Sequence, residues 1–313
     1  MSELVAGTAE QLAFLEELTA NGLLIPSGVP GVYGRGTAFE SLRLALDSLV
    51  TRSAIDDVVR VERMAFPPVI PRRQLEAIGY LGSFPHLAGS IFSFTGDEDQ
   101  AVELAEHAAA HEDWSSFQSQ TDLVLVPAAC YPSYPAIAAR GDLPDGGVSL
   151  DLGGSYVFRN EPSSDPARMQ MFHQRELVRF GSPDVVADWR QRWCDRALEL
   201  LRGLGLDAQS DVASDPFFGR TGRMLARSQR SQALKFEVGV PIGGVGPTAV
   251  ASFNCHREHF SGLYGMSRSD GGEVHTACVG FGLERITLAM LFEHGCDQQA
   301  WSTELRAQLE PSA

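Results

Sequence analysis

The segment 158–180 constrains the fold of this 313-residue chain more than any other part of its sequence. It reads FRNEPSSDPARMQMFHQRELVRF and follows closely on a glycine pair. Residues 154–158 are rich in β-branched and aromatic side chains, which predicts a strand. The cluster 162–166, with its prolines, serines and aspartate, predicts a turn. Residues 169–180 return as a second strand, so the segment predicts an antiparallel hairpin that carries a charged loop.

Charged and aromatic side chains on this hairpin suit a nucleotide. Arg159 and Glu161 lie two residues apart and would share one face of the first strand. A guanidinium is a planar fork that matches phosphate oxygens. A carboxylate accepts from an exocyclic amine such as that of adenine, and Phe172 could stack on the base. The alternative is an ordinary hairpin with a surface ion pair, and for this motif alone the alternative is favoured.

A later stretch, 280–288, changes that balance. It reads GFGLERITL, and its glycines allow close approach of the backbone. Apolar residues then follow at helical spacing: Ile286, Leu288, Ala289, Leu291 and Phe292. Arg285 falls in the first turn of that helix, where the helix dipole already favours anions. A buried strand-to-helix joint with Arg285 beside a carboxylate is the alternative, but hairpin and joint together favour a nucleotide site.

Composition bounds the class of protein. Hydrophobic residues make up 44% of the chain and charged residues 21%, which is typical of a globular protein with a sizeable core. The formal net charge of −15 argues against broad nucleic-acid binding, which needs an excess of Lys and Arg. We find no membrane-length apolar run and no leader, so a cytoplasmic protein is expected. Five scattered cysteines do not form a disulfide framework.

The pattern along the chain predicts an α+β fold in one domain over 1–313. Helices are expected over 9–22, 37–53, 71–79, 95–116, 134–139, 183–203 and 219–232, with a last helix starting near residue 282. Strands are expected over 61–70, 123–127, 233–240, 248–255 and 274–279, besides the hairpin. A loop with a short strand is expected over 25–36, and a loop over 207–217. Because the strands are joined by hairpins, we expect a mainly antiparallel sheet flanked by helices.

Spacing alone offers one metal candidate. Cys255, His256 and His259 lie in NCHREH, and His275 could join them. Thiolate and imidazole are good zinc ligands. No CxxC or HExxH is present, so a loop with surface histidines is the favoured interpretation.

Four arginines are predicted to share one helix face: Arg220, Arg223, Arg227 and Arg230. At roughly 100° per residue they span an arc of about 80°. A solvated face is the ordinary explanation of such a run. The other explanation is a docking site for an acidic partner. A face with four arginines is notable in a chain of net charge −15.

Several motifs resemble known families. FRNE with the strand after it resembles motif 2 of the class II aminoacyl-tRNA synthetases, GFGLERI resembles motif 3, and VERMAFPP at 61–68 resembles motif 1. PAACYPSYP at 127–135, DPFFGR at 215–220 and SQALKFEV at 231–238 resemble the amino acid:[carrier protein] ligases. These ligases are similar to the catalytic core of the atypical, methanogen-type seryl-tRNA synthetases but lack a tRNA-binding domain. The resemblance covers nearly the whole chain.

The resemblance implies an ATP-dependent ligase. It would activate a small amino acid, glycine or alanine, to the aminoacyl-adenylate and pass it to the phosphopantetheine thiol of an acyl carrier protein. Serine stays open as a substrate. The resemblance also implies Mg²⁺ with ATP, a homodimer formed through the motif 1 region, and no tRNA or membrane partner.

The same resemblance assigns residues to ATP. Arg159 and Arg285 would be catalytic, with Arg159 on the α-phosphate and the carboxylate. Arg285 would reach the γ-phosphate and, with Phe172, hold adenine between them. The full ATP-binding set implied is Arg159, Glu161, Arg168, Met169, Phe172, Ala249, Val250, Ala251, Ser252 and Arg285.

A zinc site and a docking helix follow from the resemblance as well. Zn²⁺ would be held by Cys130, Glu176 and Cys278, with an open position for the substrate amine. Glu176, Glu237 and Asn254 would bind the amino acid. The helix with the four arginines would dock the carrier protein. With the family match, this zinc set is favoured over the Cys255 cluster.

Three rival functions stay open. One is a catalytically inactive paralogue that senses an amino acid, and pyrophosphate exchange would separate it from the ligase. Another is a free-standing aminoacyl-tRNA synthetase, which aminoacylation of tRNA would reveal. A plain α+β scaffold protein is the least favoured, because two motifs match.

Overall fold

The computed structural model describes residues 6–54, 61–244 and 246–310. Its centre is a seven-stranded sheet with the order β3-β7-β8-β12-β11-β10-β9. Neighbouring strands pair antiparallel, except β3 and β7, which are parallel. The strands are Val61–Met64 (β3), Val148–Phe158 (β7), Met171–Gly181 (β8), His275–Gly282 (β12), Pro247–Arg257 (β11), Lys235–Pro241 (β10) and Gln209–Val212 (β9). The expected α+β class with a mainly antiparallel sheet is confirmed.

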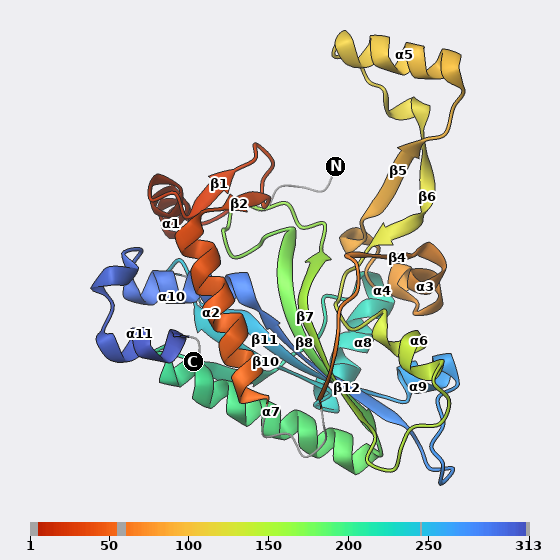
Figure 1. Ribbon diagram of the computed structural model, residues 1–313, viewed down its shortest axis with the longest axis vertical. Coiled ribbons are helices and arrows are strands. Elements are labelled where there is room, and N and C mark those ends of the chain that lie inside the picture. Colours follow the sequence, from red (N-terminus) through yellow and green to blue (C-terminus); the bar gives the residue numbers. More distant parts are fainter. Residues whose placement is uncertain (1–5, 55–60, 245, 311–313) are drawn as a thin grey trace.

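Helices cover this sheet and extend from it (Figure 1). They are Ala9–Ala20 (α1), Thr37–Ser53 (α2), Arg72–Ala77 (α3), Tyr80–Ser83 (α4), Glu98–Ala109 (α5), Ser133–Ala138 (α6), Pro183–Gly203 (α7), Gly219–Ser231 (α8), His259–Tyr264 (α9), Leu283–His294 (α10) and Thr303–Leu309 (α11). Short 3₁₀ turns lie at Pro85–Leu87, Ser115–Phe117 and Gln298–Ala300. A two-stranded ribbon, Leu24–Pro26 (β1) with Tyr33–Arg35 (β2), joins α1 to α2.

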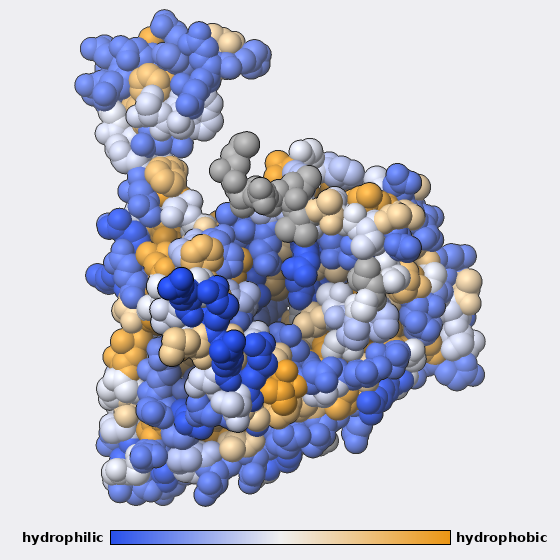
Figure 2. All heavy atoms as spheres, turned by 180° about the vertical axis from the view of Figure 1, so that it is seen from behind, coloured by the Kyte–Doolittle hydropathy of each residue, from blue (hydrophilic) through white to orange (hydrophobic). Residues whose placement is uncertain are grey.

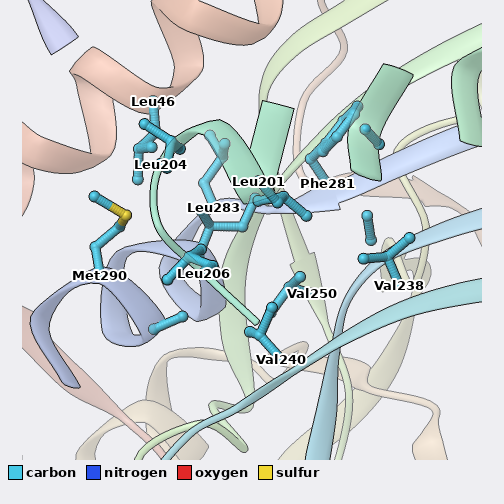
Figure 3. Close-up of a cluster of buried hydrophobic side chains, with 14 of the residues drawn as sticks. Leu46, Leu201, Leu204, Leu206, Val238, Val240, Val250, Phe281, Leu283 and Met290 are labelled. Atoms are coloured by element: carbon cyan, nitrogen blue, oxygen red, sulfur yellow. The ribbon is translucent and has the colours of Figure 1, made fainter. Parts of the chain in front are cut away.

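The sheet buries a separate core on each face, because successive side chains of a strand point to opposite sides. Leu177 of β8 packs with side chains of α2, α7 and α10, whereas the next residue, Val178, packs with α6 and α9. Figure 3 shows part of the first core, where Leu46, Leu201 and Met290 come from these three helices. This arrangement fixes the middle strands, which carry the candidate site, between two packed layers.

An arm projects from the body (Figure 1). It consists of the strands Ser90–Phe94 (β5) and Gln118–Leu125 (β6), which form a three-stranded sheet with Val69–Pro71 (β4), and of α5 at the tip. The helix α5 has no buried side chain, and its Val102 is 58% exposed. The arm therefore gains little from packing against the rest of this chain.

Several predicted boundaries are wrong. The strand 61–70 is divided into β3 and β4, because Pro67 and Pro68 have no N–H for a ladder. The helix 95–116 is only α5, and His111 has a positive φ of 58° soon after its end. The strand 123–127 is the end of the longer β6, and Leu123 is 42% exposed because β6 belongs to the arm rather than to the main sheet.

Other elements were missed. The predicted loop 207–217 contains β9, a polar edge strand with no alternation of apolar residues to mark it. The helix α10 is followed by α11, so it is not the last one. By contrast, α2 and α7 have the predicted boundaries 37–53 and 183–203. Among the described residues, no helix is both long enough and apolar enough to span a bilayer.

Candidate active site

A cavity of about 390 Å³ lies at the middle of the sheet. Its wall comes from the central strands β8, β10, β11 and β12, from the turn before α6, and from α4, α8 and α9. Residues predicted for three different tasks line it together: Cys130, Arg159, Glu176, Asn254 and Cys278. Both polar groups and rings, such as Phe84 and Phe217, contribute to the wall.

Two thiols and a carboxylate meet in this wall. The ligand atoms of Cys130, Glu176 and Cys278 all lie within 4.8 Å of one another, and each residue is at most 3% exposed. Glu176 pairs in register with Gly280, so Cys278 is its diagonal neighbour on the same face of the sheet. The turn that carries Cys130 is tied to the same strand, because the Cys130 N–H donates to Glu176 Oε2 at 2.6 Å.

Burial alters the acid–base properties of these groups. It raises the pKa of the Glu176 carboxyl and of the Cys130 thiol. The pKa of Cys278 is raised well above its usual value by its hydrogen bond with Cys130 and by burial. In the part of the chain that the structure describes, no ion pair neutralises these three acidic groups, so they form a site that a divalent metal ion would neutralise.

Three arginines cluster near the cavity, and one of them, Arg159, lines it together with Glu176. Arg285 opens α10, and its Nε donates to the Ala167 carbonyl at 2.7 Å while Nη1 donates to the Ala249 carbonyl at 2.8 Å. Burial and repulsion from Arg159 and Arg168 lower the pKa of Arg285 to about 10. Clustered guanidinium groups that repel one another are typical of an anion site. The preceding glycines matter too, since a Cβ at Gly280 would lie 2.8 Å from Gln174 Nε2.

The other predicted ATP residues surround these arginines. Strand β7 ends at Phe158, so the prediction that Arg159 and Glu161 share a strand face is wrong. Both lie in a tight turn in which the Glu161 N–H donates to the Arg159 carbonyl at 2.8 Å. The Arg159 guanidinium carbon lies 6.0 Å from the centre of the Phe172 ring. Met169 is buried, and Arg168 is half exposed beside Asp165.

Of the predicted ATP-binding residues in the strand segment 249–252, some face the cavity and others face the core. Ser252 lines the cavity, whereas Val250 and Ala251 are buried in the first core. Figure 3 places Val250 among the side chains of that core. The side chains of these two residues are therefore packed in that core rather than in the cavity, and the Ala249 carbonyl already accepts from Arg285.

The predicted residues Glu237 and Asn254 have other partners. The Asn254 amide donates to Cys278 Sγ at 3.4 Å. Glu237 accepts from Lys235 Nζ at 2.9 Å, and Asp215 binds the same ammonium group at 2.5 Å. Lys235 is the only lysine in the sequence, and it is 6% exposed. That uniqueness was the signal that could have singled out Lys235 as part of the site.

Sequence reasoning also missed Gln174. Its Oε1 accepts from the Ala129 N–H at 3.1 Å and so anchors the turn before Cys130. Gln174 lies two residues before Glu176, so the period of a strand could have placed it on the same face.

The Cys255 cluster does not assemble. Within the described residues, the one group of metal-ligand type is Cys130, Glu176 and Cys278. His275 lies instead near the carboxylates of Glu258 and Glu273, 3.7 and 3.8 Å away. His256 is turned inward, and burial lowers its pKa to about 3, so its ring is neutral. A bulge in β11 between Cys255 and Arg257 breaks the spacing on which the cluster depended.

The helix α8 carries its arginines at the surface beside the cavity. Arg220, Arg223, Arg227 and Arg230 are all exposed. Strongly hydrophilic side chains gather in the region of α8 in Figure 2. Exposed apolar residues accompany them, with Phe218 at 59% and Met224 at 71%. Leu225 and Gln229 of the same helix line the cavity, so α8 separates it from this basic surface.

Comparison of the sequence with known proteins identifies the family. No family model matches the chain. The amino acid–[acyl-carrier-protein] ligase 1 of Bradyrhizobium diazoefficiens is 44% identical over 300 residues, which cover 96% of this chain and 91% of that protein. The chain belongs to the amino acid–[acyl-carrier-protein] ligase family. Ligase 2 of the same organism is 43% identical over 92% of the chain and 85% of its own length.

More distant relatives are tRNA ligases. The type-2 serine–tRNA ligase of Methanopyrus kandleri is 24% identical over 87% of this chain, which spans about half (54%) of that protein. The solved structure of M. kandleri SerRS in complex with A. aeolicus tRNASec superposes with a TM-score of 0.80 and 19% identity. The superposed region covers 99% of this chain and 61% of the M. kandleri chain. Seryl-tRNA synthetase from Pyrococcus horikoshii, solved with ATP, gives a TM-score of 0.64 at 17% identity over 90% of this chain and 58% of its own. The fold is thus the class II aminoacyl-tRNA synthetase catalytic core, as expected.

Proposed function

We propose that this chain activates a small amino acid with ATP and transfers it to the phosphopantetheine thiol of an acyl carrier protein. The observation that carries the proposal is that Arg159 lines one cavity with a buried Cys–Glu–Cys group, while Arg285 and Arg168 lie close enough to Arg159 for their charges to interact. The names of the two relatives at 44% and 43% identity supply the carrier protein and the class of reaction.

The first step joins the amino acid to AMP. A carboxylate oxygen of the amino acid bonds to the α-phosphorus of ATP, and the bond from that phosphorus to the bridging oxygen breaks. Pyrophosphate leaves with the electron pair, accompanied by Mg²⁺. Arg159 holds the α-phosphate and the entering carboxylate, and Arg285 holds the outer phosphates, so both neutralise charge that grows in the transition state. Glu161 accepts from the adenine amine, and Phe172 packs on the ring.

The buried acidic group fits Zn²⁺. Two thiols and a carboxylate are zinc ligands, they lie within 4.8 Å of one another, and three protein ligands leave one position open. When bound, the ion supplies a Lewis-acidic position that takes the neutral amino group of the substrate. Glu176 and Cys278 on adjacent strands, with Cys130 on the anchored turn, would hold it. Arg159 lines the same cavity, so it would be available to the carboxylate of an amino acid held there.

The second step uses the carrier thiol. Its sulfur bonds to the acyl carbon, the bond from that carbon to the phosphate oxygen of the adenylate breaks, and AMP leaves. The thiol proton is released to solvent. The basic face of α8 docks the acidic carrier protein. Leu225, on the inner side of α8, lines the cavity that the phosphopantetheine group of the carrier must enter. Glycine or alanine is the expected substrate, and serine is the next candidate.

Pyrophosphate exchange tests the activation step. Radiolabelled pyrophosphate is exchanged into ATP with each of the twenty amino acids, with zinc-loaded and chelator-treated protein. Exchange with one small amino acid, lost after chelation and restored by zinc, is the expected result. A folded, zinc-loaded sample without exchange would contradict the proposal and favour the amino-acid-sensing paralogue. Charging of total tRNA by the same sample would favour the free-standing synthetase.

Charge reversal on α8 tests the docking step. Arg223→Glu and Arg227→Glu should each raise the carrier concentration for half-maximal loading about tenfold at low salt, because like charges would face each other. The exchange reaction needs no carrier and reports whether each variant is folded. Arg306→Glu, at an exposed position of α11, is the matched control. Equal loading by all three variants would exclude α8 as the docking surface.

A further inference from the structure

His256 lies against the sulfur of Cys278. Its Nε2 is 3.5 Å from Cys278 Sγ, and its Nδ1 is 3.1 Å from the Thr276 hydroxyl. The Tyr134 hydroxyl lies 3.4 Å from the same Nδ1. A neutral imidazole has one N–H and one acceptor nitrogen. The nearer of the two hydroxyls, that of Thr276, can donate to Nδ1, so the hydrogen is assigned to Nε2, which then points at the sulfur.

The two sulfurs share further neutral donors. Asn254 Nδ2 is 3.4 Å from Cys278 Sγ, so this sulfur faces two N–H groups. The Tyr134 hydroxyl also interacts with the Cys130 thiol. Tyr134 and Thr276 are fully buried, and the His256 ring contacts the Phe260 ring edge-to-face at 4.9 Å. These groups are therefore held rigidly around the two thiols.

We propose that His256, with Asn254, is a positioning residue that donates hydrogen bonds to the Cys278 thiolate and thereby sets the metal affinity of the Cys130–Glu176–Cys278 site. This inference rests on the proposed metal site. The reason is electrostatic, because two thiolates and a carboxylate place three negative charges around a divalent ion and leave one in excess. N–H donors to sulfur spread that excess charge without adding a cation that would compete with the metal.

The donor geometry also orients the ligand. Cys278 is on β12 and Asn254 is its cross-strand partner on β11. A sulfur that faces two donors keeps one rotamer, so Cys278 is in place before the ion arrives. Removal of either donor should therefore weaken binding even though every ligand remains.

The test measures zinc affinity rather than turnover. Wild type, His256→Phe, His256→Gln and Asn254→Leu are titrated with zinc against a chromophoric chelator. The absorption of the cobalt-substituted proteins reports on the thiolate ligands. His256→Phe and Asn254→Leu should each bind zinc about 10–100-fold more weakly and shift the thiolate-to-cobalt band. His256→Gln should recover most of the affinity, because its amide nitrogen can reach the position of Nε2.

His259→Phe is the matched control. His259 is exposed, and its ring contacts the same Phe260 ring at 4.8 Å. It should bind zinc as wild type does. Wild-type affinity in both His256→Phe and Asn254→Leu would overturn the inference, as would equal loss in His256→Phe and His259→Phe. A wild-type protein that binds no zinc would overturn both the metal site and this inference, whereas normal zinc binding without pyrophosphate exchange would overturn only the proposed reaction.

Discussion

The backbone holds Arg285 in place. Two N–H groups of the side chain donate to the carbonyls of Ala167 and Ala249, which come from separate segments of the chain. An arginine held in this way keeps the rest of its fork for a ligand, and its planar geometry is what makes both contacts possible. A lysine has a single nitrogen and cannot span the two carbonyls.

We predict that Arg285→Lys lowers kcat/KM for ATP in pyrophosphate exchange by about 10–100-fold, since one or two charge-assisted hydrogen bonds are lost. Thermal unfolding of the variant serves as the control for folding, and Arg306→Lys on α11 serves as the control for charge. Unchanged kcat/KM would show that the guanidinium geometry is not used.

The single lysine gives a second prediction. Burial alone would raise the pKa of Asp215, but the ammonium of Lys235, the Gln229 amide and Arg159 together outweigh it and hold that pKa below the usual 3.8. Burial would lower the pKa of Lys235, but Asp215 and Glu237 outweigh it and raise that pKa above 10.5. The stability from Asp215 is therefore complete above pH 3.8 and is lost as pH falls through its folded value. The stability from Lys235 is complete below pH 10.5 and is lost as pH rises through its folded value.

Asp215→Asn should accordingly lower the free energy of unfolding by about 2 kcal/mol between pH 5 and 9. The difference from wild type should shrink as pH falls below 3.8, because the Asp215 carboxyl is then protonated in the unfolded chain before it is protonated in the folded one. Urea unfolding of both proteins at a series of pH values measures this difference in the free energy of unfolding. A difference that stays constant down to pH 3 would show that the ion pair does not stabilise the fold.

Residue-level inference from sequence, guided by the family resemblance, picked out one set of residues that the structure does bring together. Cys130 and Cys278 are two of only five cysteines, and the structure brings both to Glu176. It failed where geometry depended on a local irregularity. The bulge at Cys255/Arg257 turns His256 inward, and no periodic pattern announces a bulge. The roles of the predicted ATP-binding residues stay predictions.

At the scale of elements, a buried ion network joins two strands to a helix. Arg175 of β8 is 1% exposed and binds Asp151 of β7 at 2.5 Å and Asp47 of α2 at 2.8 Å. Its Nη2 also donates to Thr51 at 2.8 Å. Loss of one carboxylate would leave a buried cation only partly compensated.

Asp151→Ala should therefore lower the free energy of unfolding by about 3 kcal/mol. The matched control is Glu62→Ala on the adjacent strand β3, where the exposed pair with Arg140 should contribute less than about 1 kcal/mol. Denaturant midpoints for the two variants make the comparison. Equal losses in both would contradict a special role of the buried network.

The first and last residues of an element could be predicted from sequence where the element is a long amphipathic helix. The helix α7 begins with Pro183 in its first turn, a strong start signal, and buries Trp189 and Trp193 on one face. The edge strand β9 and the helix α5 of the arm have no buried face of this kind, although Asp97 and Gln100 form a capping box at the start of α5. Their residues are mostly polar or exposed, and local pattern reflects burial.

At the scale of the molecule, β3 is an edge of the main sheet. It pairs with β7 on one side, and among the described residues no strand pairs with its other side. Open edges are usually covered. This edge lies in the region that resembles motif 1, so we predict that the chain forms a homodimer there. Light scattering at micromolar concentration should give twice the mass of one chain, and a monomer at that concentration would contradict the prediction.

The projecting arm has a consequence for proteases. Between Arg73 and Arg140 the sequence contains neither Lys nor Arg, so trypsin has no bond to cleave anywhere in β5, α5 or β6. The same span contains glutamates on exposed α5, including Glu98 and Glu103. A glutamate-specific protease should therefore nick the arm early and leave the body whole, while trypsin should begin its attack elsewhere. The most outlying part of the molecule would then survive longest in a tryptic digest, as an intact fragment.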